Sequence, residues 1–147
     1  MLGLFRFKGG VKPPSHKEAS AGTPIRKAAL PPRLIVSLRL NSRATAKPLV
    51  AVGDQVSKGQ LIGHAEGIMA AGIHAPTSGQ VVAIEDTHYP HPSGLSASSI
   101  IIAPDGEDRW CELTPFDASH AEPQALRDYL RESGIVGLGG AGFPSHV

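Results

Sequence analysis

The fold of this chain is decided by the stretch Val52-Gly53-Asp54-Gln55-Val56-Ser57-Lys58-Gly59-Gln60-Leu61. Its two glycines allow backbone angles that side chains disfavour, and its aspartate can hydrogen-bond within its own turn, so the valines can fill a core between tight turns. A second stretch of this kind follows at His74-Ala75-Pro76-Thr77-Ser78-Gly79-Gln80-Val81. Because such short apolar runs cannot build a flat open sheet, they predict a small sandwich or flattened barrel whose chain changes sheets at glycines.

The composition agrees with one mostly β domain. The chain has 147 residues, of which 17 are glycine and 13 are proline, while aromatic residues make up 5% and charged residues 18%. A hydrophobic share of 41% is enough for a single core, so the glycines and prolines indicate turns between short strands rather than disorder. Helical bundles and coiled coils are disfavoured.

Further strands are predicted on both sides of the two turn motifs. Apolar residues alternate with period two over Leu34–Leu40, which predicts a first strand. Short apolar runs predict strands over Gln80–Ile84 and Ser99–Ala103, and an edge strand over Arg109–Leu113.

One helix is predicted near the C-terminus, from Glu122 to Ser133. Pro123 suits a first helical turn, and Gly134 offers a left-handed cap after the last turn. The helix places its apolar residues Leu126, Tyr129 and Leu130 on one face.

Residues 1–33 are predicted to form an irregular basic arm that wraps the domain, since paired glycines and prolines interrupt every candidate element. Ten of the fourteen basic residues lie in residues 1–50, where Glu18 is the one acidic residue. Such an arm can meet an acidic partner or an anionic surface, or it can simply be solvated. No aromatic residue lies between Lys8 and Lys47, so bases have no stacking platform and nucleic-acid binding is disfavoured.

The candidate binding site is the glycine-rich string Gly137-Leu138-Gly139-Gly140-Ala141-Gly142-Phe143-Pro144. It matches G-x-G-x-x-G, but a dinucleotide fold needs a strand before it and a helix after it, and this context is missing. Its backbone N–H groups could converge on an anion or lie under a planar ring, unless the string is only a flexible tail. The candidate cofactor-binding residues are Gly137, Gly139, Gly140, Ala141, Gly142 and Phe143. Because the chain stops at Val147, we expect it to be part of a longer protein.

No catalytic or metal-ligating set is predicted. The single cysteine, Cys111, excludes an internal disulfide and any iron–sulfur site made by this chain alone. His88 and His91 lack further ligands nearby in sequence, so we expect them in a turn rather than at zinc. The acidic residues Glu85-Asp86 and Asp105-Gly106-Glu107-Asp108 adjoin turn residues, where solvated carboxylates are common.

The two turn motifs, G-D-x-V-x-x-G-Q and A-P-x-x-G-x-V, resemble the biotinyl and lipoyl domain family and its relatives with a barrel-sandwich hybrid fold. A carrier domain of that family needs a lysine at the tip of the hairpin between the motifs. Here that hairpin reads Glu66-Gly67-Ile68-Met69-Ala70-Ala71-Gly72 and has no lysine, while Lys58 stands in a different turn. A docking role is therefore favoured over a carrier modified on Lys58 or an adaptor, which stay as alternatives.

The glycine-rich string is similar to the flavin-binding loop of the NADH-oxidising subunit of respiratory complex I and of the RnfC (RsxC) family. Leu138 stands where the complex I protein usually has arginine and is closer to RnfC. Three other segments agree with RnfC: Phe7–Pro14, His74–Gly79 and His91–Leu95. The resemblance implies an arm (1–33), a barrel-sandwich hybrid domain (34–116) and the opening of a truncated α/β domain for FMN and NADH (117–147).

The resemblance also implies a role in an ion-translocating electron transport complex. A protein of this family passes electrons between NADH and ferredoxin through FMN and two [4Fe–4S] clusters, which would lie outside this chain. Its partners would be the other Rnf subunits, and it would lie peripherally at the cytoplasmic side of the bacterial inner membrane. For residues 1–147 alone, we expect a soluble, mainly structural and docking domain without activity of its own.

Overall fold

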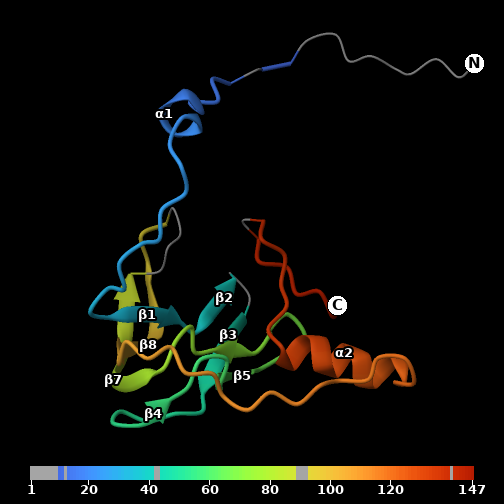
Figure 1. The fold of residues 1–147 in the computed structure, drawn as a ribbon. Coiled ribbons are helices and arrows are strands. Elements are labelled where there is room, and N and C mark those ends of the chain that lie inside the picture. Colours follow the sequence, from blue (N-terminus) through green and yellow to red (C-terminus); the bar gives the residue numbers. More distant parts are fainter. Residues whose placement is uncertain (1–9, 12, 42–43, 89–92, 140) are drawn as a thin grey trace, which may run out of the picture.

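The structure, a computed structural model, describes residues 10–11, 13–41, 44–88, 93–139 and 141–147. Within them, eight strands form two four-stranded antiparallel sheets (Figure 1). One sheet has the order β1 (Leu34–Ser37), β8 (Ser96–Pro104), β7 (Gly79–His88) and β4 (Gln55–Val56). The other has the order β2 (Arg39–Asn41), β3 (Ala44–Pro48), β5 (Leu61–Ala65) and β6 (Ile73–His74). The prediction of a mostly β sandwich is confirmed.

The core lies between the sheets and takes its valines from the two turn motifs. Val56 is 3% exposed and Val81 is fully buried, as the motif pattern predicts. The buried core cluster consists of Leu38, Ala46, Val56, Ile62, Ala75, Val81, Ile100 and Ile102.

Leu38 is the point where the chain passes from one sheet to the other. Its N–H donates to Ser98 O of β8 in the first sheet (2.9 Å), and its carbonyl accepts from Ala46 N of β3 in the second (2.7 Å). The single strand predicted over Leu34–Leu40 is therefore wrong, since the structure has β1 and β2 on either side of Leu38. This one change of sheet occurs at a buried leucine, whereas the connections from β3 to β4 and from β4 to β5 change sheets through segments that contain Gly53 and Gly59.

The strands predicted over Gln80–Ile84 and Ser99–Ala103 are longer in the structure, as β7 and β8. The edge strand predicted over Arg109–Leu113 is wrong. β7 and β8 pair along their whole length, from Gly79↔Pro104 to His88↔Ser96. Residues 109–113 make only an isolated parallel bridge between Trp110 and Lys58. The ladder stops there because the next residue that could extend it, Gln60, donates its N–H to Ser57 O (3.1 Å) and accepts from Ala75 N (2.9 Å) instead.

The described part of the arm, residues 10–11 and 13–33, does not wrap the domain as predicted. Residues 13–33 are exposed throughout, and the arm projects from the sandwich with one helical turn, α1 (Glu18–Ala21) (Figure 1). The last part of the arm lies against the sandwich, where Lys27–Pro31 lines a cavity of about 500 Å³ with Thr77 and Asp108. The turn α1 was not predicted, because it buries no side chain that would give a periodic pattern.

The predicted C-terminal helix is confirmed as α2 (Pro123–Glu132), which ends before Gly134 at φ +70°. α2 buries no residue completely and meets the end of β5 through Arg131 in its last turn. Nowhere in the described part of the chain is a helix long and apolar enough to cross a membrane.

Candidate functional site

The glycine-rich string forms a loop closed by its own backbone. Gly137 N donates to Phe143 O (2.8 Å), and Ser145 N donates to Ile135 O (3.0 Å). Val136 and Pro144 form an antiparallel bridge at the base of the loop, and Pro144 is buried. The base of the loop is thus fixed, which argues against a flexible tail.

The tip of the loop presents unused backbone donors. Within the described residues, the amides of Leu138, Gly139 and Ala141 donate no hydrogen bond. Leu138 and Phe143 are exposed beside them. Gly140, another predicted site residue, lies outside the described residues. Backbone amides of this kind are able to donate to anionic or carbonyl oxygens of a ligand.

Two of the loop glycines are not required by the fold itself. A Cβ at Gly139 would meet nothing within 4 Å, and one at Gly137 would meet Phe143 O only at an ordinary 3.6 Å. Gly142 differs, because its φ is +52° and a Cβ there would lie 3.1 Å from Leu40 O. Packing explains Gly142, whereas Gly137 and Gly139 leave room for a ligand to approach the backbone. The backbone of the loop is therefore open to a ligand at Gly137 and Gly139.

Lys58, the lysine of the carrier alternative, is engaged in contacts. Its ammonium group lies 2.6 Å from Asp108 Oδ2 and 4.9 Å from the centre of the Trp110 ring. Thr77 Oγ1 donates to the other oxygen of Asp108 (3.0 Å). The hydrogen bond from Lys58, followed by that from Thr77, lowers the pKa of the Asp108 carboxyl. Lys58 is therefore part of a surface ion pair and stands outside the hairpin between the motifs.

The acidic residues near position 105 fix a loop rather than forming a paired-carboxylate site. Ser78 Oγ donates to Asp105 Oδ1 (2.7 Å) and accepts from Arg109 N (2.9 Å). Arg109 Nη2 also donates to Asp105 Oδ2 (2.9 Å). The Ser78 hydrogen bond is the main cause that lowers the pKa of Asp105. The importance of Ser78 was missed, although its place in the A-P-x-x-G motif could have indicated it.

A cavity of about 580 Å³ opens between the sandwich and α2. His74, Cys111, Tyr129 and Ser133 are among its lining residues. Partial burial lowers the pKa of His74, and the nearby charge of Glu132 opposes this. Across the described ranges, no three His, Cys, Asp or Glu side chains are grouped to hold a metal ion. His91, paired with His88 in the sequence argument, lies outside them.

Comparison with known proteins identifies similar chains. A family model described as the RnfC barrel sandwich hybrid domain matches residues 5–107. The C subunit of the ion-translocating oxidoreductase complex of Pseudomonas aeruginosa is 50% identical over 146 residues, which cover 99% of this chain and 19% of that protein.

Proteins of the same name from two other bacteria show similar values. The Pectobacterium atrosepticum protein is 46% identical over 143 residues, covering 97% of this chain and 20% of that protein. The Salmonella arizonae protein is 42% identical over 145 residues, covering 98% and 21%. The chain thus spans about a fifth of the length of these relatives. The matches span nearly the whole chain, so they reach well beyond the family model.

Proposed function

The chain belongs to the RnfC barrel sandwich hybrid family, and from that premise we propose that it is the N-terminal part of the C subunit of an ion-translocating electron transport complex. The relatives are named as the C subunit of an ion-translocating oxidoreductase complex. In this proposal the full-length protein passes electrons between NADH and ferredoxin. Two [4Fe–4S] clusters would be held by parts of the protein outside this chain, since Cys111 is its single cysteine.

Within this chain, the glycine-rich loop would contribute to the FMN site. Bound FMN would supply the exchange between two-electron and one-electron chemistry. The free amides of Leu138, Gly139 and Ala141 would donate to its oxygens, while Gly137 and Gly139 leave the backbone open to it. Gly140, Gly142 and Phe143 complete the proposed contact set. One observation supports this role. The base of the loop is fixed by backbone hydrogen bonds, while among the described residues the amides at its tip donate to nothing and two of its glycines are not needed for packing.

The sandwich would serve as a structural and docking domain. Its closed core needs no ligand, and its exposed basic arm is available to the other members of the complex. We place the assembled protein peripherally, at the cytoplasmic side of the bacterial inner membrane. The carrier alternative is disfavoured, because the Lys58 ammonium is paired with Asp108.

The test is flavin binding and reduction by the full-length protein, purified gently and reconstituted with FMN. We expect one bound flavin whose absorbance is bleached by NADH under anaerobic conditions. Failure to retain FMN after reconstitution, together with no bleaching by NADH, would overturn the proposal.

A further inference from the structure

The turn Glu66–Gly72 connects β5 to β6 at the place where a carrier domain would present its modified lysine. In this protein the turn is held by other parts of the chain. Carbonyl groups of four residues of the turn region each accept a hydrogen bond from a side chain, and three of these four bonds come from the segment that follows the sandwich. This turn is therefore a contact surface rather than a free tip.

Arg131, in the last turn of α2, makes the largest share of these bonds. Its Nη2 donates to Ala65 O and to Gly67 O, both at 3.0 Å. Its own carbonyl accepts from Gly72 N at 2.8 Å. One residue thus bonds both ends of the turn. Hydrogen bonds from a charged donor are stronger than neutral ones, so this contact contributes more than an ordinary surface bond.

Two glycines let the backbones meet beside Arg131. A Cβ at Gly72 would overlap the carbonyl of Glu132, and a Cβ at Gly134 would overlap the carbonyl of Gly72. Gly72 is buried in this contact. The close approach fixes where α2 ends and therefore where the glycine-rich loop begins.

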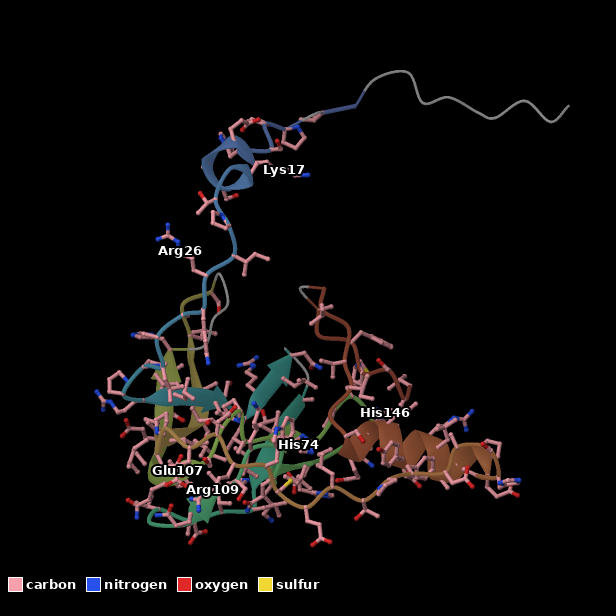
Figure 2. The ribbon with its side chains drawn as sticks, in the orientation of Figure 1. Lys17, Arg26, His74, Glu107, Arg109 and His146 are labelled. Carbon is pink, nitrogen blue, oxygen red and sulfur yellow. The ribbon has the colours of Figure 1, made fainter. Side chains whose placement is uncertain are left out.

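His146 holds the turn from the other end of the loop. Its Nε2 lies 3.0 Å from Ile68 O, and because a carbonyl only accepts, Nε2 carries the proton. Asn41, at the end of β2, donates to the next carbonyl, Met69 O (3.1 Å). Figure 2 labels His146 on the C-terminal segment, next to α2. The loop is thus anchored at both ends, by Arg131 before it and by His146 after it.

We propose that the turn Glu66–Gly72 supports the base of the glycine-rich loop. Arg131 and His146 are then positioning residues, which determine where the free amides of the loop lie. This inference rests on the proposed flavin role of the loop. The carrier scaffold then keeps its hairpin but uses it as a fixed support. Neither side chain needs to touch FMN, because each acts through the base of the loop.

The experiment compares variants of the full-length protein by amide hydrogen exchange and by FMN affinity. Arg131→Met and His146→Ala should speed exchange in residues 66–72 and 135–147 while leaving β7 and β8 unchanged. His146→Ala should weaken FMN binding about tenfold, the equivalent of one lost hydrogen bond, and Arg131→Met, which loses two, should weaken it at least as much. His146→Gln, whose amide can donate to Ile68 O, should restore both values, which a general loss of stability would not do.

The matched control is Arg127→Met on the same helix, because Arg127 is exposed and its side chain makes no hydrogen bond or ion pair within the described residues. This variant should have the same amide hydrogen exchange and the same FMN affinity as the natural protein. Unchanged exchange in Arg131→Met and His146→Ala would overturn the inference, and so would altered exchange with unchanged FMN affinity. If exchange changes as expected but the natural protein binds no FMN, the support of the loop by Arg131 and His146 stands and the proposed function fails.

Discussion

The ammonium group of Lys58 lies 2.6 Å from Asp108 Oδ2 in a contact that joins the first turn motif to the loop after β8. An acylated amine would lose its positive charge and with it this ion pair. We therefore predict that Lys58 carries no biotin or lipoate. Intact-mass measurement on protein from its native host should give the unmodified mass, and an added biotinyl or lipoyl mass on Lys58 would support the carrier alternative instead.

A second prediction concerns Ser78, whose hydroxyl is buried and both donates and accepts a hydrogen bond. Ser78→Ala removes the acceptor of Arg109 N and one donor to Asp105, so it should cost about 1–3 kcal/mol of unfolding free energy. Urea denaturation measures this. Ser96→Ala, at the exposed start of β8, is the control and should change little. Equal stability of the two variants would contradict the role of Ser78.

The loop glycines should separate folding from binding. Gly139→Ala meets no atom within 4 Å, so it should leave the unfolding free energy unchanged while weakening FMN binding of the full-length protein about tenfold or more. Gly142→Ala forces a side chain into φ +52° against Leu40 O and should cost about 1–2 kcal/mol of stability. Thermal unfolding and flavin fluorescence titration measure the two effects. Full FMN affinity in Gly139→Ala would count against the loop as a flavin site.

The pH dependence of stability should contain a contribution from His74. Burial lowers its pKa in the folded protein below the ordinary 6.5, so between these two pKa values the unfolded chain binds more protons than the folded one. Stability from His74 is thus complete above pH 6.5 and declines as the pH falls, until the folded pKa is reached. The carboxyl groups of Asp105 and Asp108 also have lowered pKa values, but they change the stability only below pH 3.8, their ordinary pKa. Urea unfolding at several pH values just below 6.5 measures how steeply the unfolding free energy falls with pH. The fall should be less steep in His74→Gln than in the natural protein, and an equal fall would contradict the prediction.

Local chemistry made part of this fold predictable. Tight turns place Val56 and Val81 in the core, and a proline at the start with a glycine after the end delimits α2. The sheet change at Leu38 could not be predicted, because alternation looks the same whether a strand continues or crosses to another sheet. Each sheet takes one backbone bond from Leu38, and this is visible only in three dimensions.

The candidate site was predictable only in outline. The glycine string indicated a backbone binding loop, since its spacing is local. Its anchors were missed because Arg131 and His146 bond to carbonyls of Ala65, Gly67 and Ile68, which carry no side-chain signal in the sequence. Ser78 and Asp105 were missed as a pair for a related reason, because their contact links distant segments.

The last prediction concerns the basic arm. Residues 13–33 are exposed, so deleting residues 1–33 should leave the thermal unfolding of the sandwich and the flavin content nearly unchanged. Assembly with the other members of the complex should weaken, because the arm carries positive charge toward any acidic partner. The measurement is recovery of the complex by affinity purification, and full recovery after the deletion would contradict a docking role for the arm.

Charge and length of the arm can be separated with a matched variant. The variant has an arm of the same length in which Lys17, Arg26 and Arg33 are changed to glutamine. Like the deletion, it should lower the amount of complex recovered. Salt should reproduce the loss in the natural protein, since exposed charges are screened over about 8 Å at physiological ionic strength. If the glutamine variant assembles fully while the deletion does not, the arm docks through its backbone or apolar residues, and the electrostatic part of the prediction is wrong.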